Sequence, residues 1–241
     1  MINENETRSL AHHKDRAGRE VLEPLGIGIP TILAATPDEV AVFAAAHAAE
    51  QFVVKPDSGS NSVGVQKVAK AELAELFRTR PDLLGTQIVQ PAGDFTHPFP
   101  LEVQPYDPQS RADFDGWAKS DATKELRVYG FHSPQGTATF PVARAIKDGV
   151  DHWFFVDPES VPPRLRERTA AAMRRVADIT AAAAVYGTVD YGYGKWGAQA
   201  PDWHAIELNG KAPYLIGYDK HAGVADKLRD LFAAQIAGVA A

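Results

Sequence analysis

The sequence contains no cysteine among its 241 residues. This absence excludes disulfide bonds, zinc sites built on thiolates and cysteine nucleophiles. It is compatible with a reducing compartment. Other familiar signatures are missing too: there is no His-Glu-x-x-His pair for zinc and no Gly-x-Ser-x-Gly turn for a serine hydrolase.

Long apolar runs and an excess of positive charge are also missing. No stretch approaches the roughly 18–20 apolar residues that a membrane span needs. The first six residues are polar and acidic, unlike a signal peptide. The net charge of −6 disfavours general binding to nucleic acids or membrane surfaces, which are themselves anionic. The sequence therefore predicts a soluble, cytoplasmic globular protein without a nucleic-acid or membrane partner.

Helical and strand patterns alternate along the chain, which is typical of an α+β protein. Periodic apolar residues predict helices over 7–25, 36–50, 69–80, 160–185 and 224–237. Thr36, Pro37 and Glu39 form a helix-start signal. Shorter patterns predict strands over 52–56, 63–68, 86–91, 101–106, 125–131, 137–145, 188–193 and 203–209. Residues 92–123, rich in Pro, Asp and aromatics, predict an irregular excursion of the kind that covers active sites.

The most informative stretch is 52–68, which reads as a strand, a loop of small residues and a second strand. The loop contains Gly59, Gly64 and three serines, so its backbone N–H groups and hydroxyls can surround an anion. Lys55, at the end of the first strand, can place an ammonium group beside that anion. An ordinary hairpin with a serine-rich turn is the alternative. The loop is neither a Walker A nor a Rossmann turn, because no Gly-Lys-Ser/Thr and no helix follow it.

A second group of polar residues lies on the last predicted hairpin. Asp190 is on one strand, and Glu207 and Asn209 are two apart on the other, so the latter two project from the same face. Two carboxylates and an amide oxygen suit Mg²⁺, or Mn²⁺ in its place, and leave positions for phosphate oxygens. The alternative is a solvated hairpin face.

Together these motifs resemble the ATP-grasp ligases. Lys55-Pro56 followed by the 59–65 loop is similar to the phosphate loop of D-alanine–D-alanine ligases. Glu125-Leu126-Arg127-Val128 and Ala143-Arg144 look more like the glutathione synthetase and ribosomal-protein glutamate ligase branch. The resemblance covers roughly residues 14–220. It implies an ATP-grasp fold with two α+β subdomains, 1–90 and 91–241, that hold ATP between two antiparallel sheets.

The resemblance also implies roles for individual residues. Lys55 would hold the α- and β-phosphates, under a lid formed by Gly59, Ser60, Ser62, Val63 and Gly64. A hinge at 88–91 would contact adenine through the backbone of Ile88, Val89 and Gln90. Asp94 would reach the ribose. Asp190, Glu207 and Asn209 would bind magnesium. Arg127 and Arg144 would stabilise the transferred phosphoryl group and an acyl phosphate.

The chain departs from the family's pattern at three places. The upstream lysine of the family is matched by Arg16, with Lys14 as the competing alignment. Lys211 stands where the family has a Pro-Gly pair, and it is either a contact to an anionic substrate or a surface residue. The usual N-terminal domain is absent, so we expect a homodimer mate, a second protein or residues 92–123 to complete the substrate site.

The function implied is an ATP-dependent carboxylate–amine ligase, with a small-molecule or peptide carboxylate and an amine as substrates. We expect it to form an amide or peptide bond in natural-product biosynthesis. Two alternatives remain at this point: a phosphotransferase on the same fold, and a nucleotide-binding subunit that is active only with a second protein.

Overall fold

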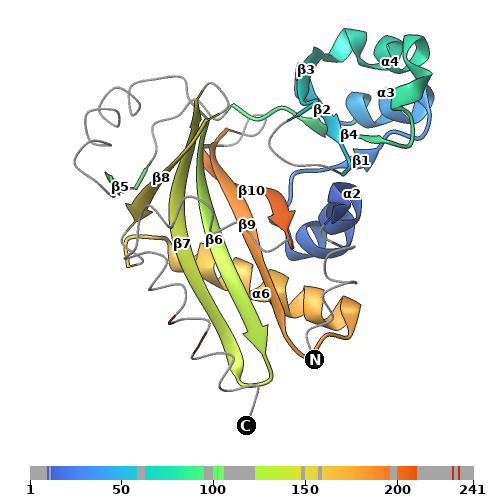
Figure 1. Cartoon of the computed structure of the whole chain (residues 1–241). Coiled ribbons are helices and arrows are strands. Elements are labelled where there is room, and N and C mark those ends of the chain that lie inside the picture. Colours follow the sequence, from blue (N-terminus) through green and yellow to red (C-terminus); the bar gives the residue numbers. More distant parts are fainter. Residues whose placement is uncertain are drawn as a thin grey trace.

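Two antiparallel sheets organise the structure (Figure 1). The computed structural model describes residues 10, 12–58, 63–94, 100–101, 103–105, 123–147, 150–156, 159–195, 200–210, 230 and 233. The smaller sheet has the strand order β1 (Ile32–Leu33), β4 (Gln87–Pro91), β2 (Gln51–Pro56), β3 (Gln66–Ala69). The larger sheet has the order β10 (Asp202–Asn209), β9 (Val185–Gly194), β6 (Thr123–Ser133), β7 (Gly136–Lys147), β8 (Val150–Val156), β5 (Val103–Pro105). This arrangement confirms the predicted α+β class.

The smaller sheet packs against helices α3 (Pro37–Ala45) and α4 (Lys70–Thr79). Thr36 begins α3 as predicted, because its hydroxyl accepts a hydrogen bond from the Glu39 amide at 3.2 Å. A short 3₁₀ turn, η3 (Pro81–Leu83), then leads into β4. The core between sheet and helices is built from buried side chains of β2, β4, α3 and α4, including Phe52, Leu73 and Phe77.

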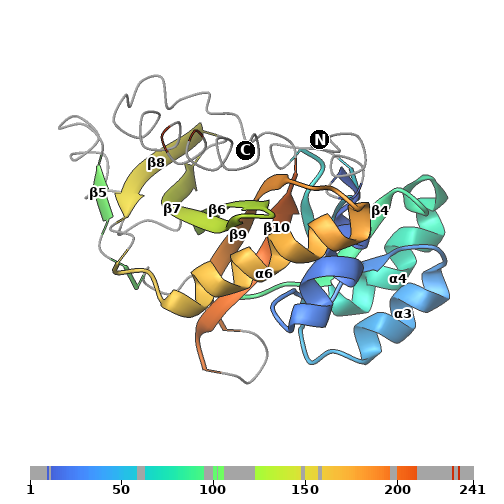
Figure 2. The same cartoon turned by 90° about the horizontal axis from the view of Figure 1, so that it is seen from below.

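Helix α6 (Pro163–Thr180) runs across one face of the larger sheet (Figure 2). Gly130 of β6 lies directly opposite Gly187 of β9, and the two glycines leave a depression in that face. Met173 of α6 fills it, since a Cβ at Gly130 would lie 2.5 Å from the Met173 Cγ atom. The close approach of helix and sheet therefore depends on glycine at these positions.

The N-terminal segment forms α2 (Lys14–Ala17), the π-helical turn η1 (Gly18–Leu22) and the 3₁₀ turn η2 (Glu23–Leu25). Gly26 ends it in the left-handed conformation, with φ at 65°. This segment lies beside β10 and next to the smaller sheet (Figures 1 and 2). Its apolar side chains, Leu10, Ala17, Val21 and Leu22, pack into the core of the larger sheet. The first helical segment expected within subdomain 1–90 therefore shares its core with the strands of the second half.

Most predicted elements are present, with ends shifted by a few residues. Strand β8 was not predicted, because its sequence, Val-Asp-His-Trp-Phe-Phe-Val, does not alternate polar and apolar residues. The helix predicted over 224–237 lies almost wholly outside the described residues. The division of the chain at residue 90 stays a prediction. Within the described ranges, no helix has the length and apolar character needed to cross a membrane.

Candidate functional site

A β-bulge in β10 places the predicted metal ligands on the side of the larger sheet opposite α6. Trp203 and Ala205 are buried toward the core, and strict alternation would send Glu207 the same way. The pairing with β9 shifts between Ala205 and Glu207, so Ile206 is the extra residue. Glu207 then lies directly opposite Asp190, while Leu208 returns to the core.

Asp190 is the buried centre of this face. Its carboxylate is only 2% exposed and accepts two hydrogen bonds from Arg127, at 2.7 Å from Nε and 2.6 Å from Nη2. Asn209 Nδ2 donates a third at 3.1 Å. Burial alone would lower the pKa of Arg127, but attraction to Asp190 and the hydrogen bonds to it outweigh burial and raise that pKa well above its usual value. Arg127 therefore remains charged.

Two lysines face this group from the other side. Lys55, at the end of β2, is buried, and Lys14, in α2, has its Nζ atom 3.7 Å from Glu207 Oε1. Burial lowers the pKa of Lys55; the Glu207 carboxylate opposes this shift and the Lys14 ammonium adds to it. Lys14, Lys55 and Glu207 therefore form one electrostatic cluster, although they come from three distant parts of the chain.

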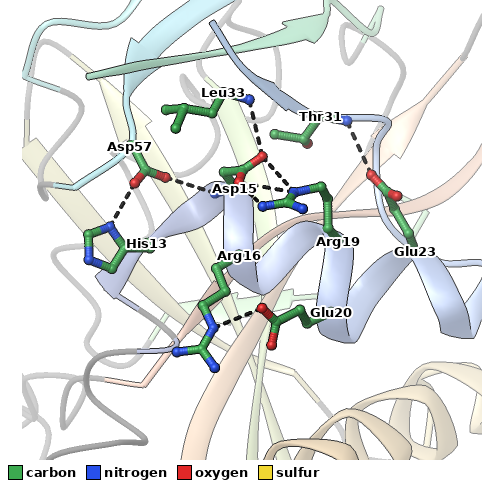
Figure 3. A network of polar contacts seen from close by, with 9 residues as sticks. All are labelled: His13, Asp15, Arg16, Arg19, Glu20, Glu23, Thr31, Leu33 and Asp57. Atoms are coloured by element: carbon green, nitrogen blue, oxygen red, sulfur yellow. Dashed lines mark hydrogen bonds and ion pairs between the residues drawn. The ribbon is translucent and has the colours of Figure 1, made fainter. Parts of the chain in front are cut away.

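Lys14, rather than Arg16, occupies the position beside Lys55. The Arg16 side chain is 41% exposed and engages Glu20, with its Nε atom 2.8 Å from Glu20 Oε1 (Figure 3). Two residues correspond to about 200° of rotation around a helix, so only one of these two cations can face the site. The geometry favours the competing alignment through Lys14.

The chain leaves the smaller sheet later than the predicted hinge at 88–91. Ile88 and Val89 are fully buried, and each lies between partners on β1 and β2, so both edges of the strand are engaged there. Gln90 is buried and donates from Nε2 to the Thr31 hydroxyl at 2.7 Å. The crossing follows Pro91, and the exposed Asp94 forms a β-bridge with Lys195, joined to β9.

The described part of the predicted phosphate loop is exposed. Val63 is 76% exposed, and Gly64 has a φ of 77°, in the region that favours glycine. Arg144 is on β7, with its backbone opposite Glu125 on β6. The predicted residues Gly59, Ser60, Ser62 and Lys211 lie outside the described residues.

Glu125 was not among the predicted site residues, yet it belongs to this surface. It is 9% exposed and lies two residues from Arg127 on β6, so both project from the same face. Its carboxylate acts on Lys55, whose pKa it raises against the effect of burial. The sequence feature that could have identified Glu125 is the alternation of charged residues along an otherwise apolar strand.

A small pocket, open in part to solvent, lies between the cluster and the end of β4. Lys14, Gln90 and Glu207 contribute its polar lining, and Leu22, Ile29 and Leu208 contribute much of its apolar lining.

The donor atoms on this face fit a hard divalent cation. Among the described residues, no three acidic or histidine side chains converge on one point, so the site offers two carboxylates and one amide. The Asn209 amide nitrogen is used on Asp190, which leaves its carbonyl oxygen as the donor to a cation. Mg²⁺ commonly takes one or two carboxylates and completes its shell with water and phosphate oxygens.

The chain has the ATP-grasp fold, as comparison with solved structures shows. D-cycloserine synthetase matches with a TM-score of 0.55 at 20% identity, over 85% of this chain and 65% of the other. D-alanyl-alanine synthetase A from Vibrio cholerae matches with a TM-score of 0.53 at 14% identity, over 87% and 58%. N5-carboxyaminoimidazole synthase from Aspergillus clavatus, solved with ADP, matches with a TM-score of 0.54 at 11% identity, over 88% and 48%.

These matches are at the level of fold. No protein-family model and no curated sequence match the chain. The chain spans about half to two thirds of the length of the solved proteins that it resembles.

Proposed function

We propose that this protein is an ATP-dependent carboxylate–amine ligase that works through an acyl phosphate. The observation that carries the proposal is that Lys14 and Lys55 face Glu207 and its neighbour Asp190 across the junction of the two sheets. Cations on one side and metal-type ligands on the other are what a magnesium nucleotide requires. The names of the structural neighbours, two synthetases of D-amino-acid products among them, support the same reaction class.

In the proposed reaction, a substrate carboxylate oxygen attacks the γ-phosphorus of ATP and ADP leaves. An amine then attacks the acyl carbon, phosphate leaves and the amine gives up a proton. Lys14 and Lys55 bind the phosphates. Arg144 neutralises charge on the transferred group, as the resemblance implies. Positioning and fixed charge supply most of the rate in phosphoryl transfer.

Magnesium would be held by Asp190, Glu207 and Asn209, and there it would neutralise the charge of the phosphate oxygens. Arg127 contributes by holding the Asp190 carboxylate in place, since both of its described donors point at that group. This assignment differs from a direct contact between Arg127 and the phosphoryl group.

The test is a product assay on the purified chain with Mg²⁺, ATP and a panel of amino acids and peptides. We expect ADP and free phosphate in equal amounts, together with a new amide detected by mass spectrometry. ADP with a phosphorylated product would support a phosphotransferase instead. Nucleotide binding without turnover, relieved by adding a partner protein, would support a subunit role. No nucleotide binding at all would remove the basis of the proposal.

A further inference from the structure

Asp57, the residue directly after β2, is connected to the start of α2 through both its side chain and its backbone (Figure 3). Its carboxylate lies 2.7 Å from His13 Nδ1 and accepts the Asp15 amide at 2.8 Å. Its carbonyl oxygen accepts the Lys14 amide at 3.0 Å. Its own amide donates to the Thr86 carbonyl at 2.9 Å, which ties the residue to the smaller sheet.

These contacts supply hydrogen-bond acceptors at the start of α2, which the sequence of the helix itself does not supply. The first amides of a helix lack partners within the helix, and a side chain at the N-cap commonly supplies one. His13, the N-cap residue of α2, makes no such bond. Asp57 supplies both acceptors from a distant segment, so the helix begins where Asp57 holds it.

The position of that helix decides where Lys14 stands. The amide of Lys14 is bonded to the Asp57 carbonyl oxygen, and Lys55 lies two residues before Asp57, near the end of β2. A single residue therefore links the backbones that carry both lysines. Asp15 adds a second attachment, because its carboxylate accepts the Leu33 amide of β1 at 3.1 Å.

We propose that Asp57 is a positioning residue, which fixes Lys14 beside Lys55 so that the two ammonium groups bind phosphate together. The inference rests on the proposed ATP site, and it concerns geometry rather than contact with the nucleotide. Loss of the Asp57 carboxylate removes its contacts with His13 Nδ1 and the Asp15 amide and so loosens the start of α2. Both lysines and the backbone bond from Lys14 to Asp57 remain.

Titration calorimetry of Mg·ATP against the full chain tests this role without depending on turnover. We expect Asp57→Ala to weaken binding by about tenfold, the effect of losing one charge-assisted contact. Lys14→Ala should weaken it by a similar factor. In the double variant, removing Asp57 should add nothing further, because its effect passes through Lys14.

Two conservative variants separate position from charge. Asp57→Asn keeps the acceptor for the Asp15 amide and can donate to His13 Nδ1, so we expect binding close to that of the unaltered protein. Asp57→Glu keeps the charge but moves the anchor by one methylene, so we expect weaker binding. These two variants also retain polar contacts, which keeps the test available if Asp57→Ala does not fold.

Thr36→Ala serves as the matched control. It removes one N-cap bond from α3, far from the lysines, so it should lower thermal stability but leave Mg·ATP affinity unchanged.

Additive effects of Asp57→Ala and Lys14→Ala, or unchanged affinity in Asp57→Ala, would overturn the positioning role alone. An unaltered chain that binds no Mg·ATP would overturn both this role and the proposed function. Binding without ligation would leave the positioning role standing.

Discussion

Replacing Arg127 with methionine should destabilise the fold by about 3 kcal/mol, because it leaves the buried Asp190 carboxylate without its cation. Removal of one member of a buried ion pair typically costs about 3–5 kcal/mol. We take the lower end because the Asn209 amide remains 3.1 Å from Asp190 and still donates to it. For a chain of this size, the melting temperature should fall by roughly 6–12 °C.

Urea denaturation and calorimetry provide the measurement, with Asp190→Asn combined in a double-mutant cycle. The double variant should be more stable than Arg127→Met alone, since it removes both charges. Adding Mg²⁺ should raise the melting temperature of Arg127→Met more than that of the unaltered protein, because the ion replaces the lost positive charge. A loss below about 1 kcal/mol, as for an exposed pair, would refute the reasoning.

Three further outcomes can be measured. Burial lowers the pKa of Lys55. Because phosphate binding needs the ammonium form, Mg·ATP affinity should fall as pH rises through that lowered pKa. Calorimetry of Lys55→Arg should show a weaker dependence of affinity on pH. Glu207→Gln should abolish ADP release in a coupled assay while the circular-dichroism spectrum stays unchanged, because it removes the charge of a proposed metal ligand without changing the packing. Gly187→Ala should lower stability by about 1–3 kcal/mol, since its Cβ would lie 2.8 Å from the Asn209 carbonyl oxygen. Gly18→Ala, which meets only ordinary contacts at 3.5 Å, is the control and should melt within a few degrees of the unaltered protein in calorimetry.

The parts of the site that follow from local chemistry could be predicted from the sequence. Glu207 and Asn209 are two apart on one strand, and a spacing of two already implies a shared face. The bulge at Ile206 could not be predicted, because it depends on how β10 pairs with β9. The pattern of Trp203 and Ala205 alone would have turned Glu207 toward the core.

The hinge and the upstream cation depended on contacts between distant segments. Ile88 and Val89 occupy a central strand only because β1 pairs with β4 on the far side, and nothing within 86–91 reveals that pairing. The choice between Lys14 and Arg16 depended on the rotation of a helix that Asp57 anchors from elsewhere. Neither the strand pairing nor the helix rotation can be inferred from the sequence near the residues concerned.

The cluster of Lys14, Lys55 and Glu207 also has a consequence for folding. Its members come from the N-terminal helix, the smaller sheet and the last strand of the larger sheet, so no fragment or half-folded chain possesses it. A nucleotide bound there stabilises only the fully assembled state, by about 2.7 kcal/mol at a concentration one hundred times its dissociation constant. The bound nucleotide would thus stabilise the association of the two sheets, and its affinity would report whether the whole chain has folded.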